Sequence, residues 1–365
     1  MSIGQDPVSD AAPPRIEAVS RAEAARVRAE ARLASTIADF FLDADARLDE
    51  RTRLTLAHVL DGIVGAIEAD IRRHAARLLA SGGDPARGEA VLKPGGSVVA
   101  RLTRARLLHD DELMDELIAR VRHDLIADAL PIAIAGPDEA SLLVRLAGVP
   151  DSVVSSAANA LLAAESRRRA ANENGTVAGS ELSAELHHRL VWWIAAAIRE
   201  GLRDGNAASD QAITDAALRS LSAHDEGDRP EAVAMRLAAA IDARPEELAS
   251  LLVESIGDRR LSLFVAVLAL AIGVDFDQAR AITLEPEGDR LWLALRAANL
   301  DRPTIARIGL ALSDADPRRD IEAFADGLDA IAAVPMADAR AALASLALHR
   351  DFRAAMRALA RSDRR

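Results

Sequence analysis

The stretch that decides the fold covers residues 48–79, LDERTRLTLAHVLDGIVGAIEADIRRHAARLL. Its large apolar residues recur every three or four positions and share one face of a helix, while most charged residues fall off that face. The residues of the apolar face are Leu56, Val59, Leu60, Ile63, Val64, Ile67 and Ile71. We therefore expect one long amphipathic helix, or two helices broken at Gly62 and Gly65, because glycine weakens a helix.

The same helical spacing continues on both sides of this stretch, and the composition agrees with it. Half of the 365 residues are hydrophobic but only 2% are aromatic, so alanine, leucine, valine and isoleucine supply the apolar content. Alanine and leucine are strong helix formers, and arginine and glutamate are nearly as good. Strand-like alternation occurs only in short pieces such as residues 131–135. The chain is therefore predicted to be all-α.

Capping chemistry places several helix starts. An aspartate or a proline at the start of a helix suits the backbone N–H groups that have no partner there. We expect helices to begin beside Asp275, beside Asp301 and after Asp316–Pro317.

Two segments interrupt the helical pattern and divide the chain. Residues 1–14 contain three prolines and no periodicity, which is typical of a disordered tail. Residues 172–176, NENGT, lack large apolar side chains and carry turn-forming residues. We expect an N-terminal HEAT-like helical domain over residues 15–171, a linker over residues 172–181 and a C-terminal helical domain over residues 182–365.

An internal repeat indicates how the helices stack. Residues 70–79, DIRRHAARLL, and residues 151–162, DSVVSSAANALL, share a capping aspartate, a β-branched residue, paired alanines and paired leucines. They begin 81 residues apart, which is about two periods of the roughly 40-residue HEAT repeat. The spacing predicts a HEAT-like α-solenoid, or stacked helical hairpins with a C-terminal helical domain. Unrelated amphipathic helices are the alternative, because alanine-rich helices resemble one another by chance.

Two blocks of the sequence resemble a known family. The first comprises LDERTR at residues 48–53, followed by Leu60, Glu68, Ile71, Arg72 and Ala75. The second comprises LSLF at residues 261–264, Gly273, Gly288 and AANL at residues 297–300. Together they resemble an uncharacterised family of helical, HEAT-like proteins of alphaproteobacteria, over about two thirds of the chain. The resemblance implies an all-helical fold and a regulatory or scaffolding role, and it implies no catalytic residue.

The composition also excludes several classes of protein. Without cysteine the chain has no disulfide, thiolate zinc site or cysteine nucleophile. The N-terminus lacks an apolar signal core, and the longest apolar run, residues 261–274, is shorter than the roughly 20 residues that span a bilayer. We expect a cytoplasmic protein that does not insert into membranes. Its formal net charge of −12 argues against a broad nucleic-acid surface, because a polyanion would be repelled.

No pattern concentrates catalytic, cofactor or metal chemistry, so we expect no such site. Residues 93–97, KPGGS, lack the strand-loop-helix context of a phosphate loop and predict a turn. Residues 109–112, HDDE, predict a helix N-terminus rather than a metal site, because adjacent residues on a helix point in different directions. The pair His187–His188 has no partner at helical spacing, and we expect it to be solvated.

Two further patterns keep other functions open. His58 lies on the long amphipathic helix, where an exposed histidine would suit phosphotransfer. Its place at the edge of the apolar face favours a packing role, since Val59 follows it and no lysine is near. Arginines occur at residues 167–169 and every four residues at 353, 357 and 361. They would have to merge into one basic surface to bind nucleic acid, whereas the helix dipole alone accounts for the C-terminal arginines.

The two adjacent tryptophans are the strongest candidates for an interaction site. At 100° per residue, Trp193 shares the apolar face of its helix with Leu190, whereas Trp192 projects from the opposite side near His188 and Arg199. Such an indole is either packed by another layer of helices or presented to a partner, and tryptophan is enriched at binding hot spots. We expect Trp192, His188 and Arg199 to form a partner-binding surface.

These features predict a non-enzymatic protein-interaction scaffold or adaptor in bacterial signalling or regulation. Its partner is expected to be a protein that the sequence does not identify, rather than a nucleic acid. A phosphotransfer-type or other all-helical enzyme is the first alternative. A HEAT-like nucleic-acid binder is the second.

Overall fold

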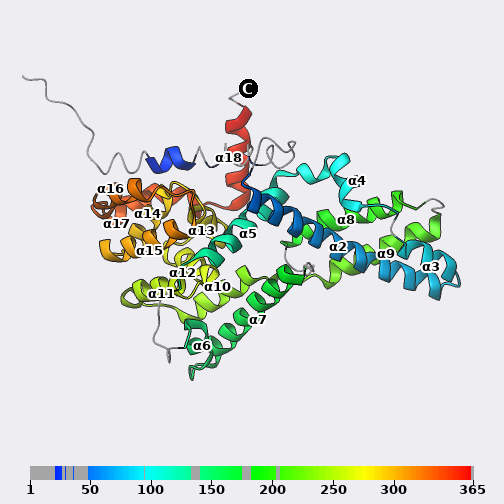
Figure 1. Cartoon of the computed structure of the whole chain (residues 1–365), viewed down its shortest axis with the longest axis horizontal. Helices are drawn as coiled ribbons and strands as arrows, with labels where there is room; N and C mark the ends of the chain where they lie inside the picture. Colours follow the sequence, from blue (N-terminus) through cyan, green and yellow to red (C-terminus); the bar gives the residue numbers. More distant parts are fainter. Residues whose placement is uncertain are drawn as a thin grey trace, which may run out of the picture. The chain divides into compact units, whose positions relative to one another are not determined.

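The structure is a computed structural model that describes residues 21–26, 29, 36, 48–93, 95–132, 140–174, 182–202 and 206–362. The tail expected over residues 1–14 and residues 175–181 of the expected linker lie outside this part. Every regular element among the described residues is helical, and no strand occurs there (Figure 1). The all-α prediction is therefore confirmed.

The chain divides into two compact units, each described by itself below. The central unit comprises residues 32–127 and 134–242, and the C-terminal unit comprises residues 243–365 together with residues 1–31 and 128–133. The central unit contains residues from both sides of the linker expected at residues 172–181. The domain bounds expected from the sequence stay predictions.

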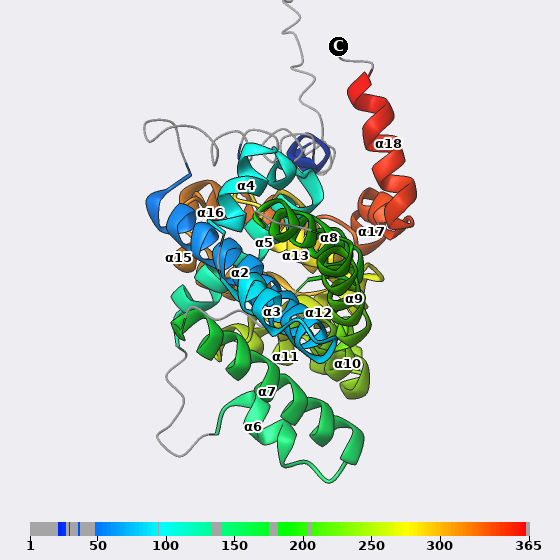
Figure 2. The same ribbon diagram turned by 90° about the vertical axis from the view of Figure 1, so that its right-hand side faces the viewer.

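The longest described helix of the central unit is α2, which runs beside α3 (Figure 2). The elements of this unit are α2 (Glu50–Ser81), α3 (Pro85–Leu92), α4 (Val98–Arg104), η1 (Leu107–His109), α5 (Asp111–Ala129), α6 (Leu142–Ala147), α7 (Ser152–Asn174), α8 (Ala184–Glu200), α9 (Ala207–Ala223), η3 (Glu226–Asp228) and α10 (Pro230–Ile241). The last two residues of α5 belong to the C-terminal unit. Helices that follow one another in the sequence often pack together, as α2 with α3, α6 with α7 and α8 with α9 do.

Helix α2 is one uninterrupted helix of 32 residues, so the alternative of a break at Gly62 and Gly65 is wrong. Asp49 caps its start by accepting a hydrogen bond from the backbone amide of Thr52 at 2.9 Å. The whole predicted apolar face is buried, and α2 packs against α3, α8 and α9. This burial outweighs the roughly 1 kcal/mol that each mid-helix glycine costs, because each buried leucine or isoleucine contributes about 1.5–3 kcal/mol.

A buried ionic cluster joins α5, α7 and α10 within the central unit. Arg168 of α7 lies 2.8 Å from Glu231 of α10, and Arg229, the residue before α10, lies 2.9 Å from Glu116 of α5. Arg168 is only 6% exposed, whereas its two arginine neighbours in the sequence are exposed. The arginine run at residues 167–169 is therefore split, because its middle member links helices inside the unit.

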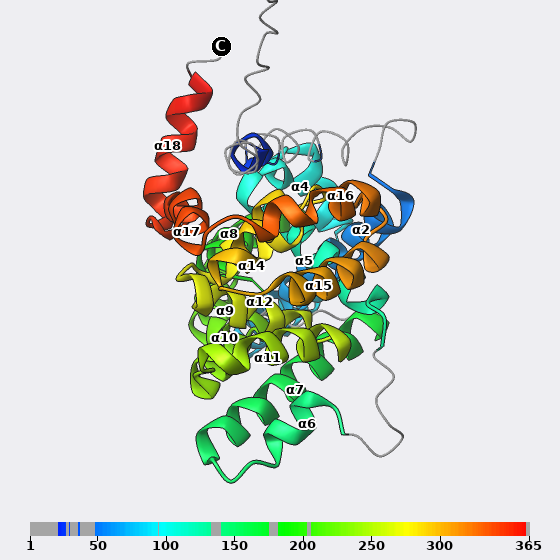
Figure 3. The same ribbon diagram turned by 90° about the vertical axis from the view of Figure 1, so that its left-hand side faces the viewer.

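The C-terminal unit forms around the apolar helix α12 (Figure 3). Its elements are α11 (Pro245–Gly257), α12 (Leu261–Ile272), α13 (Phe276–Thr283), α14 (Asp289–Ala297), α15 (Arg302–Ala315), α16 (Ile321–Ala332), α17 (Met336–Leu343), η4 (Ala344–Ala347) and α18 (Arg350–Ser362). Every residue from Leu261 to Ala269 is buried, and α12 packs against α11, α13 and α14. The longest apolar run of the sequence is thus the core helix of this unit.

No single helix in the described part of the chain is both long enough and apolar enough to cross a membrane. Two consecutive pairs pass that test only when joined, residues 261–272 with 276–283 and residues 321–332 with 336–347. The helices of these pairs meet at 114° and 115°.

Two of the three predicted helix caps in this unit are in place. The side chains of Asp275 and Asp301 accept backbone hydrogen bonds at the starts of α13 and α15, at 2.7 and 3.0 Å. The prediction for Asp316 is wrong, because this residue ends α15 and Asp320 caps α16 instead. The Asp316 carboxylate is occupied by the Arg318 guanidinium at 2.7 Å, and residues 316–320 form the turn between the two helices.

Candidate interaction site

Helix α8 of the central unit carries the candidate site. Leu186, Leu190 and Ile194 recur every four residues and are buried in the core, which fixes the rotation of the helix about its axis. This rotation leaves His188, Arg189 and the two tryptophans facing a hollow in the surface of the unit.

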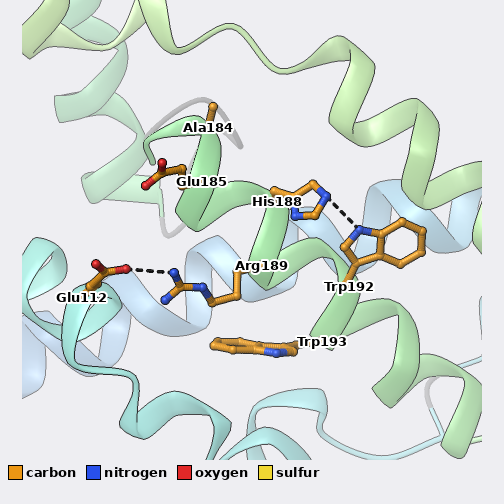
Figure 4. A pocket seen from close by; sticks show the side chains of 7 residues that line it. All are labelled: Glu112, Ala184, Glu185, His188, Arg189, Trp192 and Trp193. Atoms are coloured by element: carbon orange, nitrogen blue, oxygen red, sulfur yellow. Dashed lines mark hydrogen bonds and ion pairs between the residues drawn. The ribbon is translucent and has the colours of Figure 1, made fainter. Parts of the chain in front are cut away.

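The hollow has a volume of about 770 Å³ and is widely open to solvent. It is lined by Glu112, Ala184, Glu185, His188, Arg189, Trp192 and Trp193 (Figure 4). All of these residues belong to α8 except Glu112, which lies in the first turn of α5. Two carboxylates and one guanidinium line the hollow, so its lining is acidic overall while its two indoles are apolar.

Arg189 is held in place by two carboxylates. Its Nη1 donates to Oδ2 of Asp110 at 2.6 Å, and its Nη2 donates to Oε2 of Glu112 at 2.8 Å. The hydrogen bond to Glu112 is the main reason that the pKa of Arg189 is raised above its usual value. Asp110 also accepts a hydrogen bond from the Leu113 backbone amide at 2.9 Å and so caps α5. The helix N-terminus predicted at residues 109–112 is therefore confirmed.

Trp192 and His188 lie together, as the sequence predicted. The Nε1–H of Trp192 donates to Nε2 of His188 at 3.2 Å, which places the ring proton of a neutral His188 on Nδ1. The two rings meet edge to face, with centroids 6.3 Å apart (Figure 4). His188 is exposed, and Trp192 is half-buried against the core. The sequence left two alternatives for this indole, packing against other helices or exposure to a partner. The Trp192 side chain does some of each, because one side packs against the core and the other faces solvent.

The remaining two sequence predictions on this helix have different outcomes. Trp193 packs against the core, as its place on the apolar face predicted, but it is only half-buried and also lines the hollow beside Trp192. Arg199 lies two turns beyond Trp192 and does not line the hollow, because its guanidinium pairs with Asp210 of α9. The structure thus brings His188 and Trp192 together and leaves Arg199 apart.

Sequence reasoning missed Arg189 and its two carboxylate partners. These partners lie 79 and 77 residues earlier in the chain, so no local spacing connects them to Arg189. The only signal was the HDDE run at residues 109–112, whose acids were assigned to the helix dipole alone.

His187 is buried, so the prediction of a solvated His187–His188 pair is wrong for its first member. The His187 ring is 3% exposed and stacks on the ring of His224, with centroids 4.0 Å apart and planes within 9°. Nε2 of His224 lies 3.1 Å from the backbone oxygen of Leu182. Burial, and then the nearby His224, lowers the pKa of His187 to about 4. The two rings are stacked within the central unit, and burial disfavours a proton on His187.

The other segments singled out from the sequence have structural roles or stand apart from the hollow. Ser97 caps α4 by accepting a hydrogen bond from Ala100 at 3.1 Å, and the backbone oxygen of Gly95 accepts from Arg101. The turn expected at residues 93–97 includes residue 94, which lies outside the described residues, so it stays a prediction. Within the described residues, no group of three or more histidine, cysteine, aspartate or glutamate side chains is placed to hold a metal ion. His58 is exposed on α2, although its position favoured a packing role.

A second hollow lies within the C-terminal unit, between α11 and α15. It has a volume of about 310 Å³ and an apolar lining that includes Val253, Ile256 and Ile308, and among the described residues that line it Arg307 is the charged one. It brings together fewer chemically distinct groups than the hollow on α8, which combines indoles, carboxylates, an imidazole and a guanidinium.

Comparison with known proteins places the chain in a family. No curated protein and no solved structure matches it. The family model described as an uncharacterised protein conserved in bacteria, DUF2336, matches residues 102–344. This range contains the second of the two blocks on which the sequence resemblance rests, and the first block precedes it. Because the match covers more than half of the 365 residues, the chain belongs to the DUF2336 family of uncharacterised bacterial proteins.

Proposed function

We propose that this protein is a cytoplasmic interaction scaffold or adaptor that docks a protein partner at the hollow on α8. The observation that carries the proposal is the pair of half-buried tryptophans beside Arg189, which two carboxylates already hold in one orientation. Tryptophan and arginine dominate binding hot spots, and a side chain that is ordered beforehand loses less entropy on binding.

The chemistry of the hollow indicates what such a partner presents. Indole faces attract cations, and Glu112 and Glu185 outnumber the one guanidinium of the lining, Arg189, so the lining has a net negative charge. The hollow therefore suits an apolar side chain of the partner flanked by a lysine or an arginine. A partner with an acidic contact segment would be repelled by these carboxylates.

We also propose that the helices stack as HEAT-like hairpins. Successive helices pack pairwise in both units, as α8 with α9 and α11 with α12 do. Stacked hairpins display broad surfaces to partners, which is consistent with an interaction role.

The test compares matched variants of the tagged chain in its native host. Proteins that copurify with the wild type are quantified by mass spectrometry, and each candidate is then measured for direct binding by calorimetry. We expect Trp192→Ala and Glu185→Arg to weaken the true partner at least about tenfold. Leu218→Ala, at an exposed leucine of α9, should leave its affinity unchanged.

Two outcomes would contradict the proposal. One is a purified partner that binds Trp192→Ala and Glu185→Arg as tightly as the wild type. The other is a loss of several kcal/mol of folding stability in Trp192→Ala, typical of a core tryptophan. The second outcome would contradict the role of Trp192 as a binding residue and assign its indole to packing. Unchanged partner binding by Glu185→Arg would then reject the rest of the proposed surface as well.

A second candidate function, phosphotransfer, is supported by the surface of α2. His58 is exposed, Leu54 one turn before it is 58% exposed, and Gly65 two turns after it has open space where a side chain would lie. A mid-helix glycine costs about 1 kcal/mol of stability relative to alanine, and none of the described residues lies close enough to Gly65 to require a glycine there. Close approach of another protein to the helix backbone beside His58 would explain why a glycine occupies position 65.

The reaction would transfer a phosphoryl group from an acyl phosphate to His58. The ring nitrogen lone pair forms the N–P bond, the P–O bond to the acyl oxygen breaks, and the carboxylate leaves with the electron pair while the other ring nitrogen keeps its proton. Incubation with acetyl phosphate should yield an acid-labile phosphohistidine in the wild type and none in His58→Gln. Labelling that is equal in the two proteins, or absent from both with acetyl phosphate and with phosphorylated receiver proteins of the host, would reject this candidate.

A further inference from the structure

The last helix, α18, exposes a row of large apolar side chains. Phe352, Met356 and Leu359 are 57%, 48% and 69% exposed. Their spacing of four and then three residues places all three on one face of the helix. Other exposed large apolar side chains of the C-terminal unit, such as Leu310, are scattered singly over its helices, so a row of three on one helix requires an explanation.

The same segment is strongly cationic within an acidic chain. Residues 350–365, RDFRAAMRALARSDRR, contain six arginines and two aspartates, a formal net charge of +4, whereas the whole chain carries −12. Residues 353, 357 and 361 recur every four positions. At 100° per residue this spacing predicts a row about 100–180° around the helix from Phe352, beside the row of Phe352, Met356 and Leu359 rather than within it.

The start of α18 is fastened to the rest of the C-terminal unit. Nη1 of Arg353 donates to the backbone oxygen of Leu348 at 2.8 Å, and its Nη2 donates to Oδ2 of Asp275 at 3.1 Å. Asp275 is itself held, because its Oδ1 caps α13. One arginine therefore anchors the helix, and the apolar row remains exposed to solvent.

We propose that α18 binds an anionic lipid surface, lying along it with the apolar row in the boundary between headgroups and acyl chains. A strongly amphipathic helix of low overall hydrophobicity, with arginines on its polar face and Phe and Leu on the other, has the chemistry of an interfacial helix. Phosphate groups of the lipids complement the positive charge of residues 350–365. This attachment is peripheral and goes beyond the proposed protein scaffold, which it would hold at the membrane surface.

The two faces of α18 favour a lipid surface over a nucleic acid and over an apolar groove of a protein. A nucleic acid would engage the arginines alone and leave Phe352, Met356 and Leu359 in water, because phosphate contacts need no apolar row. An apolar groove in a protein would engage the row alone and has no need of the arginines beyond Arg353. A lipid surface engages both faces at once, since long arginine side chains reach the headgroups while the apolar row is immersed.

The test measures binding of the full-length protein to sedimented vesicles of phosphatidylcholine with or without phosphatidylglycerol. We expect binding that requires phosphatidylglycerol and falls as salt increases. Leu359→Ser should lower the partition coefficient at least about tenfold, because most of a leucine side chain is lost from the apolar layer. Arg357→Gln and Arg361→Gln should each lower it about fivefold.

Matched substitutions on α15 provide the controls. Leu310→Ser changes a leucine that is 51% exposed in the same unit, and Arg307→Gln removes an exposed arginine there. Both should bind vesicles like the wild type, and circular dichroism should show that every variant stays folded.

Several results would overturn the proposal. These are equal binding to vesicles with and without phosphatidylglycerol, no vesicle binding by the wild type, or unchanged binding by Leu359→Ser. If the wild type instead self-associates in light scattering or retards a DNA duplex, and the α18 variants abolish that without any vesicle binding, the helix serves a second copy or a nucleic acid rather than a membrane.

Discussion

The buried His187–His224 stack predicts that the protein loses stability in weak acid. His187 is 3% exposed, and burial followed by the adjacent His224 lowers its pKa from 6.5 to about 4. Between these two values the unfolded chain binds a proton that the folded chain excludes. The free energy of unfolding is therefore fully retained above about pH 6.5 and falls as the pH decreases toward 4.

The size of the effect follows from the same two values. A difference of about 2.5 pKa units corresponds to about 3 kcal/mol below pH 4 and to about 2 kcal/mol at pH 5. His224 and His188 both disfavour the charged ring, and the backbone oxygen of Ser220 favours it. Because the stacked rings interact, the measured titration belongs to the pair rather than to His187 alone.

The assay is urea unfolding at about pH 7.5 and about pH 5, compared between the wild type and His187→Phe. The variant keeps an aromatic ring against His224 but has no proton to exclude, so its stability should depend on pH by about 2 kcal/mol less than that of the wild type. His349→Phe, which removes an exposed imidazole, is the matched control and should follow the wild type. If His187→Phe and the wild type lose the same stability between the two pH values, the stack is not the source of the pH dependence.

Two other predictions concern packing, and both compare urea unfolding of the variant with that of a matched control substitution. Gly309→Ala should cost about 1–3 kcal/mol, because its new Cβ would clash with the ring of Phe324 on α16. Gly327→Ala meets only an ordinary contact at 3.8 Å and should be neutral or stabilising. Equal effects of the two substitutions would show that α16 shifts freely. Arg168→Met should cost about 3–5 kcal/mol of folding stability, because it leaves Glu231 buried without this ion-pair partner. Arg167→Met, at an exposed position, should change stability by no more than about 0.5 kcal/mol. A small loss at residue 168 would mean that water reaches the ionic cluster.

Which helices would form could be predicted closely, because helix formation depends on neighbours three and four residues apart. The apolar face of residues 48–79 is the buried face of α2, and Asp275 and Asp301 cap helices as expected. The errors occurred where a local signal had two uses. Gly62 and Gly65 weakened the expectation of one helix but did not break it, and Asp316 pairs with Arg318 instead of capping the next helix.

The candidate site was only half predictable. Helical spacing placed His188 and Trp192 together, and their hydrogen bond at 3.2 Å confirms that placement. The same rule put Trp193 inside, although the packing of neighbouring helices leaves it at the edge of the hollow. Spacing along one helix says how residues are rotated about its axis, but neighbouring helices decide how much of each face they cover.

The amino-acid order alone settled that this chain is helical and where most helices run, since periodicity and capping act over a few residues. It also set the cationic, amphipathic character of residues 350–365. The contacts that define the site were decided only by packing of distant segments. Arg189 meets carboxylates 77 and 79 residues away, and His187 is buried while its neighbour His188 is exposed. Long-range pairing and side-chain burial depend on how the helices assemble, which no local pattern records.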